Sequence, residues 1–137
     1  MEDCIFCKIV SGEIPSEKVY EDDKCLAFLN IRPNNDGQTL LIPKEHYRSY
    51  LETPDDVLEY LAVKSKLVAN AIKKGVGAEG VNIIVNSDKA AGQVIFHTHI
   101  HIIPRYSTDG FEHWKTKDGY DTKEAHVIAE KIKKEID

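Results

Sequence analysis

Three histidines at alternate positions, His97, His99 and His101, are the residues of this chain best suited to chemistry. The chain has only 6 histidines in 137 residues, and these three share one apolar segment, GQVIFHTHIHIIPR (92–105). Their β-branched and aromatic neighbours predict a strand. Since alternate residues of a strand point to one face, we expect three imidazoles on one surface, with Thr98 facing the other way.

Such a cluster favours two kinds of site. Neutral imidazole is a nucleophile and a proton carrier near pH 7, and three imidazoles also form a common platform for zinc. A third interpretation places the histidines in a core, where each buried ring would need its own hydrogen-bonding partner. The residues alone therefore rank acid–base or nucleophilic catalysis level with metal binding, and both above a purely structural role.

Length and composition predict a single globular domain over residues 1–137. A hydrophobic fraction of 42% and a charged fraction of 30% are those of an ordinary folded protein, which excludes a disordered or fibrous chain. The net charge of -5 argues against a general nucleic-acid binder but permits a small nucleotide in a local pocket.

The sequence also predicts where the protein works. No stretch approaches the ~20 apolar residues of a membrane helix, and the N-terminus, MEDCIFCKIV, lacks the basic region of a secretory signal. An odd number of cysteines, 3, suits a reducing compartment better than a disulfide framework. We expect a cytoplasmic protein that binds neither membranes nor nucleic acid.

The predicted elements place the histidines in an antiparallel sheet. Apolar runs bounded by turn residues predict five strands, at 18–20, 25–29, 38–42, 81–85 and in the histidine segment. A short helix is expected over 5–11. Together with two long helices, these strands predict an α+β fold with a five-stranded antiparallel sheet.

The two long helices have clear sequence signals. Thr53 offers a capping hydroxyl and Pro54 suits the first helical position, so a helix is expected from there to Gly75. A C-terminal helix is expected over about 122–136. Its apolar stripe consists of Ala125, Ile128, Ile132 and Ile136.

The segment from His97 to Ile103 is similar to the signature of the histidine triad (HIT) family, in which histidines alternate with apolar residues. The resemblance continues through nearly the whole chain before Tyr106, in the family order. The matching blocks are CIFCKIVSGEIPS (4–16), VYEDDKCLAFLN (19–30), GQTLLIPKEH (37–46) and residues 85–105. It points to small bacterial-type members, between the nucleoside phosphoramidases and the diadenosine polyphosphate hydrolases. It implies a single HIT domain, and a homodimer with one sheet continuous across both copies.

The resemblance implies metal-independent transfer of a purine nucleotidyl group to water. His99 would attack the α-phosphorus and form a covalent nucleotidyl–histidine, which water then hydrolyses. His101 would assist with the phosphate or the leaving group, and His97 is the first histidine of the triad. Backbone N–H groups at Gly92 and Gln93 would steady the non-bridging oxygens.

A nucleotide pocket is also implied by the resemblance. The matching positions are Ile5, Phe6, Ile9, Phe28, Asn30, Ile31, Asn86, Gly92, Gln93 and Val94. For the five large apolar residues among them, Ile5, Phe6, Ile9, Phe28 and Ile31, burial tendencies alone favour packing in the core instead.

Two positions depart from the family pattern. Most relatives carry aspartate at the position of Asn30, and the loss of its charge would weaken ribose binding by ~1 kcal/mol. Many relatives carry serine or threonine at the position of Val94, and valine cannot protonate a leaving group. The expected substrates are of the adenosine 5′-phosphoramidate type, with diadenosine polyphosphates as the alternative. A binding or interaction module with negligible turnover is the alternative of another class.

The pair Cys4 and Cys7 is either half of a zinc site or two incidental cysteines on a short helix. The resemblance adds His46 and His97, which implies a structural, four-ligand Zn²⁺ site. It also implies that C-terminal segments approach the partner's site, so Trp114 either covers the substrate or packs on its own sheet.

Overall fold

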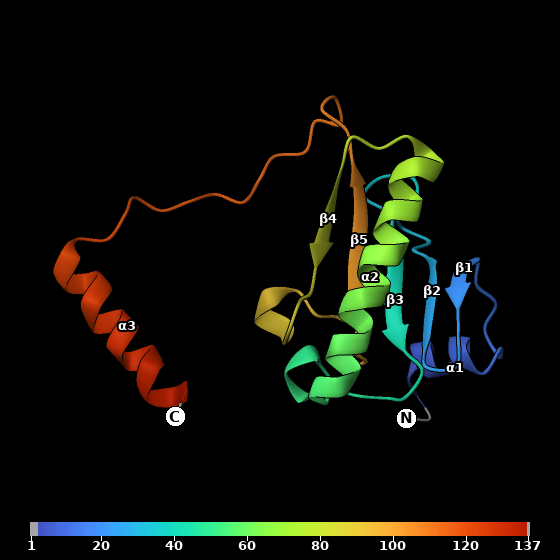
Figure 1. The fold of residues 1–137 in the computed structure, drawn as a ribbon, viewed down its shortest axis with the longest axis horizontal. Helices are drawn as coiled ribbons and strands as arrows, with labels where there is room; N and C mark the ends of the chain where they lie inside the picture. The colour runs from blue at the N-terminus through green and yellow to red at the C-terminus, as the bar shows by residue number, and fades with distance from the viewer. Residues whose placement is uncertain (1–2, 137) are drawn as a thin grey trace.

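One antiparallel sheet carries the last part of the histidine segment on an inner strand (Figure 1). The structure is a computed structural model that describes residues 3–136. Its helices are α1 (Ile5–Val10), α2 (Asp55–Val76) and α3 (Thr122–Ile136), with short 3-10 turns at Tyr50–Glu52 and Lys89–Ala91. Its strands are β1 (Lys18–Glu21), β2 (Cys25–Leu29), β3 (Thr39–Pro43), β4 (Gly80–Ile84) and β5 (Ile100–Arg105).

The strand order is β1-β2-β3-β5-β4, and every neighbouring pair is antiparallel. His101 is paired with Leu40 of β3 on one side and with Ile84 of β4 on the other. The predicted α+β fold with a five-stranded antiparallel sheet is therefore confirmed. The outer edge of β4 ends the sheet.

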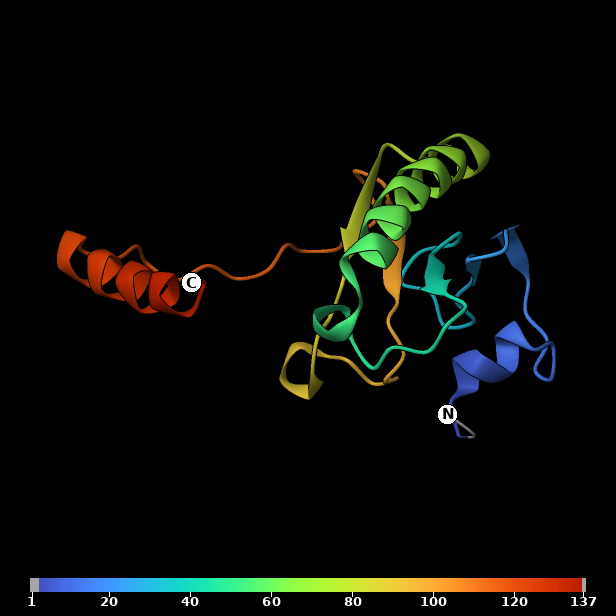
Figure 2. The same cartoon turned by 60° about the horizontal axis from the view of Figure 1, so that its bottom comes forward.

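The two faces of the sheet are covered by different helices (Figure 2). Residues on one face pack with α2, and those on the other pack with α1, because successive strand side chains alternate between faces. Ile100 and Ile102 belong to the α2 side. His101, which lies between them, therefore points to the side of α1.

The strand that carries the histidines is shorter than predicted. It begins at Ile100, so His97 and His99 precede it, and Pro104 lies inside it rather than at its end. The backbone N–H of Thr98 donates to the carbonyl oxygen of Tyr47 at 2.8 Å. Thr98 is therefore bonded to the loop after β3 and not to β3 itself. The pairing of β5 with β3 starts only at Ile100.

Both ends of α2 also differ from expectation. The hydroxyl of Thr53 donates to the carbonyl of Ser49 at 2.7 Å, and the N-cap residue is Pro54, which forms no side-chain cap. The helix continues through Gly75 and ends at Val76, before the C-cap Gly77, whose left-handed backbone (φ 68°) favours glycine.

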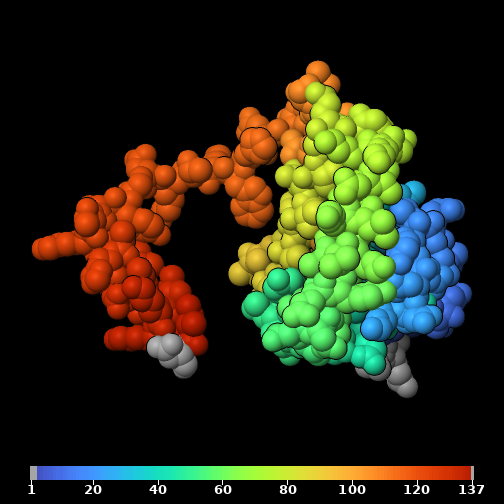
Figure 3. Space-filling view, in the orientation of Figure 1, coloured from blue at the N-terminus to red at the C-terminus, as the bar shows by residue number. Residues whose placement is uncertain are grey.

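The C-terminal helix α3 stands apart from the sheet (Figures 1 and 3). Residues 110–121, which have no regular structure, connect it to the rest of the chain, and no described residue of α3 is buried. The predicted helix is confirmed, but its apolar stripe is uncovered. Within residues 3–136, no helix combines the length and the apolar character that crossing a bilayer requires.

Candidate functional site

The three histidine rings gather beside α1, as their alternation predicts. The rings of His99 and His101 are 4.9 Å apart between centroids. The ring of Phe6 meets His97 edge-on at 5.8 Å and His99 at 5.2 Å. Thr98 points elsewhere, since its hydroxyl lies 2.7 Å from that of Thr53.

The ring of His99 is fixed by the backbone of its own segment. Its Nδ1 lies 2.7 Å from the carbonyl oxygen of His97. A carbonyl can only accept a hydrogen bond, so this Nδ1 carries the proton. The lone pair of His99 is therefore on Nε2, which leaves that nitrogen available as a nucleophile.

The opposite tautomer follows for His101. Its Nδ1 lies 3.4 Å from the side-chain amide nitrogen of Gln38. The amide oxygen of Gln38 accepts from the backbone N–H of Asn34 at 2.6 Å, so the amide nitrogen is the end that faces His101. An amide nitrogen only donates, and His101 consequently carries its proton on Nε2. Gln38 contacts the histidine cluster, and the sequence analysis did not predict this contact.

Burial lowers the pKa of all three imidazoles below their usual 6.5. The pKa of His97 falls to about 4, although its hydrogen bond to the Pro43 carbonyl opposes the shift. The pKa of His101 also falls to about 4, where the neighbouring His99 adds to the effect of burial. The pKa of His99 is lowered as well, against the hydrogen bond to His97. At neutral pH the rings are therefore uncharged.

A second cluster shares His97 with the triad. Cys4, Cys7, His46 and His97 each offer one ligand atom, and these atoms all lie within 4.8 Å of one another. The Sγ atoms of Cys4 and Cys7 lie 3.4 and 3.6 Å from Nδ1 of His97. The Sγ of Cys7 lies 3.4 Å from Nδ1 of His46. These are the four residues expected to form a zinc site.

The donor chemistry of this cluster fits a zinc ion. Nε2 of His97 lies 2.8 Å from the carbonyl oxygen of Pro43, so Nε2 holds the proton and Nδ1 presents its lone pair to the cysteines. Two thiolates and two imidazoles are a usual tetrahedral zinc set. The Pro43 carbonyl supplies the outer hydrogen bond that orients such a ligand.

A hollow of about 310 Å³ opens beside the histidines, within the size range of small-ligand sites. His99 and His101 lie at one end, and apolar side chains of α1 and β2 form the walls. Phe6, Ile9 and Phe28 are both core residues and wall residues. The hollow brings together nine of the ten residues expected to bind nucleotide, namely Ile5, Phe6, Ile9, Phe28, Asn30, Ile31, Asn86, Gly92 and Val94.

Gln93 is the expected residue that does not line this hollow. Its side chain is buried, accepting from the N–H of Asp88 at 2.9 Å and donating to the carbonyl oxygens of Arg48 and Ile95. The backbone N–H groups of Gly92 and Gln93 are also occupied, by the carbonyls of Lys89 and Asp88. The structure therefore gives Gln93 a role in shaping the loop.

The two departures from the family pattern both lie at the hollow. Val94 is exposed at its edge. The Oδ1 of Asn30 accepts from the N–H of Arg32 at 2.9 Å, which orients the side chain. Gly92, with φ of 99°, has a backbone that disfavours side chains, and a Cβ there would lie 3.6 Å from the amide of Asn86.

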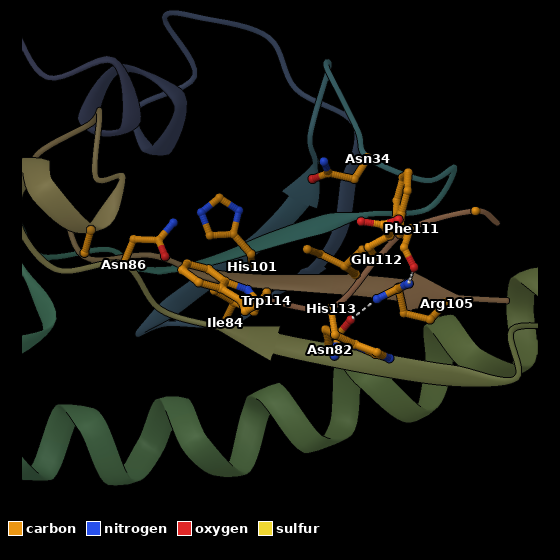
Figure 4. Close-up of a pocket in the computed structure, with 13 residues that line it drawn as sticks. Asn34, Asn82, Ile84, Asn86, His101, Arg105, Phe111, Glu112, His113 and Trp114 are labelled. Carbon is orange, nitrogen blue, oxygen red and sulfur yellow. Dashed lines mark hydrogen bonds between the residues drawn. The ribbon is translucent and has the colours of Figure 1, made fainter. Parts of the chain in front are cut away.

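A larger hollow, about 720 Å³, adjoins the first and shares His101 and Asn86 with it. Figure 4 shows Trp114, His101 and Asn86 gathered at one end and Arg105 and Phe111 at the other. The imidazole of His101 therefore stands between an apolar hollow and one lined by both polar and apolar side chains.

The titration of His101 tests this arrangement. We predict that its ring titrates near pH 4 in the folded protein, because burial disfavours the charged imidazolium. The measurement is ring NMR across pH, with the resonance assigned by its loss in His101→Gln. Core methyl signals must show that the protein is still folded at each pH. A midpoint at 6.5 or above would contradict the buried, neutral ring.

Comparison with known proteins places these features in a family. The HIT domain family matches residues 11–108. The chain is 52% identical over 107 residues to adenylylsulfatase HINT3 of Arabidopsis thaliana, covering 78% of this chain and 54% of that protein, so it spans about half the length of that relative.

Two crystal structures are also similar. A Streptococcus mutans protein is 44% identical, with a TM-score of 0.96 over 100% of this chain and 87% of its own. A Zn-bound histidine triad protein from Mycobacterium smegmatis is 39% identical, with a TM-score of 0.78 over 85% of each chain. The chain belongs to the HIT family.

Proposed function

We propose that this protein hydrolyses purine nucleotides at the α-phosphate through a covalent intermediate on His99. One observation carries the proposal: the carbonyl of His97 holds Nδ1–H of His99, which leaves Nε2 as the nucleophile at the end of the 310 Å³ hollow. A neutral imidazole held in one tautomer needs no proton removed before it attacks.

The reaction then has two steps. Nε2 of His99 bonds to the α-phosphorus as the bond to the leaving group breaks. The neutral ring of His101 donates a hydrogen bond from Nε2–H to the departing atom, and the leaving group takes its proton from water. Water next attacks the same phosphorus, breaks the P–N bond and loses its proton to solvent, which releases the nucleotide and restores the neutral ring of His99. Dividing the displacement in two replaces one difficult step by two easier ones.

Backbone N–H groups near the start of the histidine segment are suited to steady the phosphate oxygens. Those of Gly92 and Gln93 already have carbonyl partners. Among the described residues, the N–H groups of Val94 and Ile95 form no such bond, and both residues line the hollow. We therefore assign the contacts with the phosphate oxygens to the N–H groups of Val94 and Ile95 in place of those of Gly92 and Gln93.

The purine would lie against Phe6, Ile9 and Phe28, whose packing leaves one apolar wall open to the hollow. Asn30 would contact the ribose with its amide, since Oδ1 already accepts one backbone hydrogen bond. The amide of Asn86, near Gly92, lies within reach of both hollows.

The leaving group decides the substrate class. Nε2–H of His101 can donate a hydrogen bond to an amine leaving group, which supports substrates of the adenosine 5′-phosphoramidate type. Val94 and the 720 Å³ hollow, whose lining includes Arg105 and three asparagines, favour the second candidate, a diadenosine polyphosphate, whose leaving group is acidic and large. Adenylyl sulfate, the substrate in the name of the Arabidopsis relative, also has a leaving group that needs no proton.

Side-by-side turnover of these three nucleotides, with a chelator present, tests the proposal. We expect hydrolysis of at least one, and a loss of about 10³-fold or more in His99→Ala with nucleotide binding retained, because only the nucleophile is removed. Product analysis and calorimetric titration with AMP give the two readouts. Undiminished turnover in His99→Ala would overturn the catalytic assignment. Binding without any turnover in the wild type would leave a nucleotide-binding module.

We further propose that Cys4, Cys7, His46 and His97 hold a Zn²⁺ ion. The lone pair on Nδ1 of His97 and the short distances within the cluster support it. Four protein ligands would saturate the ion, so its contribution would be to hold α1 against the sheet rather than to act on the substrate.

Metal analysis of tag-free protein from zinc-replete growth tests the ion. We expect roughly one zinc per chain in the wild type and less than about a tenth in Cys7→Ala, since three remaining ligands bind far more weakly. Cys25→Ala is the matched control, because Cys25 is buried in the core away from the cluster. A zinc-free wild type, or equal zinc in Cys7→Ala, would contradict the site.

The protein is further proposed to be a homodimer. The outer edge of β4 has no partner strand among the described residues, and a free strand edge is suited to pair with a second copy. Pairing of β4 with its symmetry mate would make one continuous sheet across both protomers.

A further inference from the structure

The loop that connects β4 to the histidine segment, residues 85–95, contains a strained backbone position. Among residues 3–136, Asp88 is the only residue other than glycine with a positive φ. Its φ of 72° and ψ of 161° fall in a region that is essentially restricted to glycine, because a Cβ meets the backbone there. A residue keeps such a conformation only where its surroundings impose it. Neighbouring contacts must therefore hold Asp88 in place.

The side chain of Asp88 is not what holds it. Its Oδ1 lies 3.7 Å from Nη1 of Arg48, and the two side chains are 60% and 55% exposed. An ion pair with that much solvent around it adds little stability. The guanidinium of Arg48 is also shared with Glu52, whose carboxylate lies closer, at 3.3 Å. The contacts that impose the strain must therefore involve the backbone of Asp88.

The residue that bonds to this backbone is Gln93. Its Oε1 accepts from the N–H of Asp88 at 2.9 Å, and its own N–H donates to the carbonyl oxygen of Asp88 at 3.1 Å. Its Nε2 donates to the carbonyl oxygens of Arg48 and Ile95, at 2.9 and 3.0 Å. Gln93 is only 3% exposed, and buried hydrogen bonds are costly to break because the freed groups cannot reach water. Gln93 therefore keeps Asp88 in its strained conformation.

The same bonds fix the part of the loop that borders the site. Val94 directly follows Gln93, and the carbonyl of Ile95 is one of the groups that Gln93 holds. Val94 and Ile95 line the hollow that ends at His99, and their N–H groups have no hydrogen-bonding partner among the described residues. Neither Gln93 nor Asp88 lines this hollow. The direction of the two N–H groups therefore depends on residues outside the hollow.

We propose that Gln93 is a positioning residue: its side chain holds Asp88 in the strained conformation and thereby orients the N–H groups of Val94 and Ile95 toward the phosphate of a bound nucleotide. The strain opposes this arrangement, because Asp88 can reach an ordinary φ only by giving up its bonds to Gln93. The inference rests on the phosphate contacts of the proposed function and not on the identity of the nucleophile. Direct contact of Gln93 with the phosphate is the competing explanation.

Calorimetric titration with AMP and with adenosine separates positioning from a general structural role, because the two ligands differ only in the phosphate. The wild type should bind AMP at least about tenfold tighter than adenosine, since hydrogen bonds to a charged group are strong. Gln93→Met, which has a similar length but forms none of these bonds, should remove most of this preference and leave adenosine affinity within about twofold. An equal loss for both ligands would contradict positioning. A wild type without preference for AMP would overturn the phosphate contacts and this inference together, while turnover reports separately on His99.

Adding Asp88→Gly to Gln93→Met separates positioning from direct contact. Glycine adopts the φ and ψ of Asp88 without strain, so the loop no longer gains by relaxing. We expect Asp88→Gly to raise the AMP affinity of Gln93→Met by at least about threefold and to change that of the wild type by less than about twofold, because the two residues act as one unit. A direct contact between Gln93 and the phosphate predicts no such recovery, and that result would refute the positioning role.

A series at Asp88 tests the strain without altering a buried residue, and so stands even if Gln93→Met does not fold. Asp88→Gly should raise Tm by about 2 °C or more, because relief of the strain outweighs the greater freedom of glycine in the unfolded chain. Asp88→Val places a β-branched residue at a positive φ. It should lower Tm and reduce the preference for AMP about fivefold, with adenosine affinity retained. An unchanged Tm in Asp88→Gly, or a wild-type preference in Asp88→Val, would contradict the proposal.

Two controls complete the series. Asp88→Asn removes the charge but keeps the shape of the side chain, so its preference for AMP should stay within about twofold of the wild type. Ala90→Ser alters an exposed residue of the same loop and should change neither Tm nor the preference. A loss of preference in Asp88→Asn as large as that in Asp88→Val would assign the effect to the charge of Asp88 and overturn the role of strain.

Discussion

The buried ring and backbone of His97 connect the proposed metal cluster with the proposed nucleophile. Its Nε2 donates to the carbonyl of Pro43 at the end of β3, which turns Nδ1 toward Cys4 and Cys7 of the N-terminal helix. Its own carbonyl accepts from Nδ1 of His99. The hydrogen bond to Pro43 thus selects the tautomer for the proposed metal site, and the carbonyl selects the tautomer of the proposed nucleophile.

The helix α1 extends this connection to the substrate hollow. Cys7 belongs to the metal cluster, while Phe6, the next residue back along the chain, packs on Phe28 and on two histidine rings. A helix of 6 residues is too short to be stable alone. Its position therefore depends on core packing and on the cluster, and a zinc ion there would also hold one wall of the hollow.

Local patterns predicted much of this arrangement. Alternation placed three imidazoles on one side. The apolar runs located all five strands, most clearly the three inner ones, whose residues are largely buried. The extent of β5 was not predictable, since Thr98 bonds to Tyr47 through a tertiary contact. Gln38 has no local signal either: it fixes His101 only because β3 pairs with β5. The stripe on α3 predicted a helix but not the surface that covers it, because periodicity identifies an apolar face and not its partner.

The central claim is that the carbonyl of His97 makes Nε2 of His99 the nucleophile. The most direct test is to quench a single turnover with base, which preserves a P–N bond, and to locate the nucleotidyl group by peptide mass spectrometry and ³¹P NMR. The account predicts a transient adduct on His99, bonded through Nε2, that decays as the nucleotide is released. An adduct on Nδ1 or on another residue, or turnover with no adduct at any time point, would contradict it.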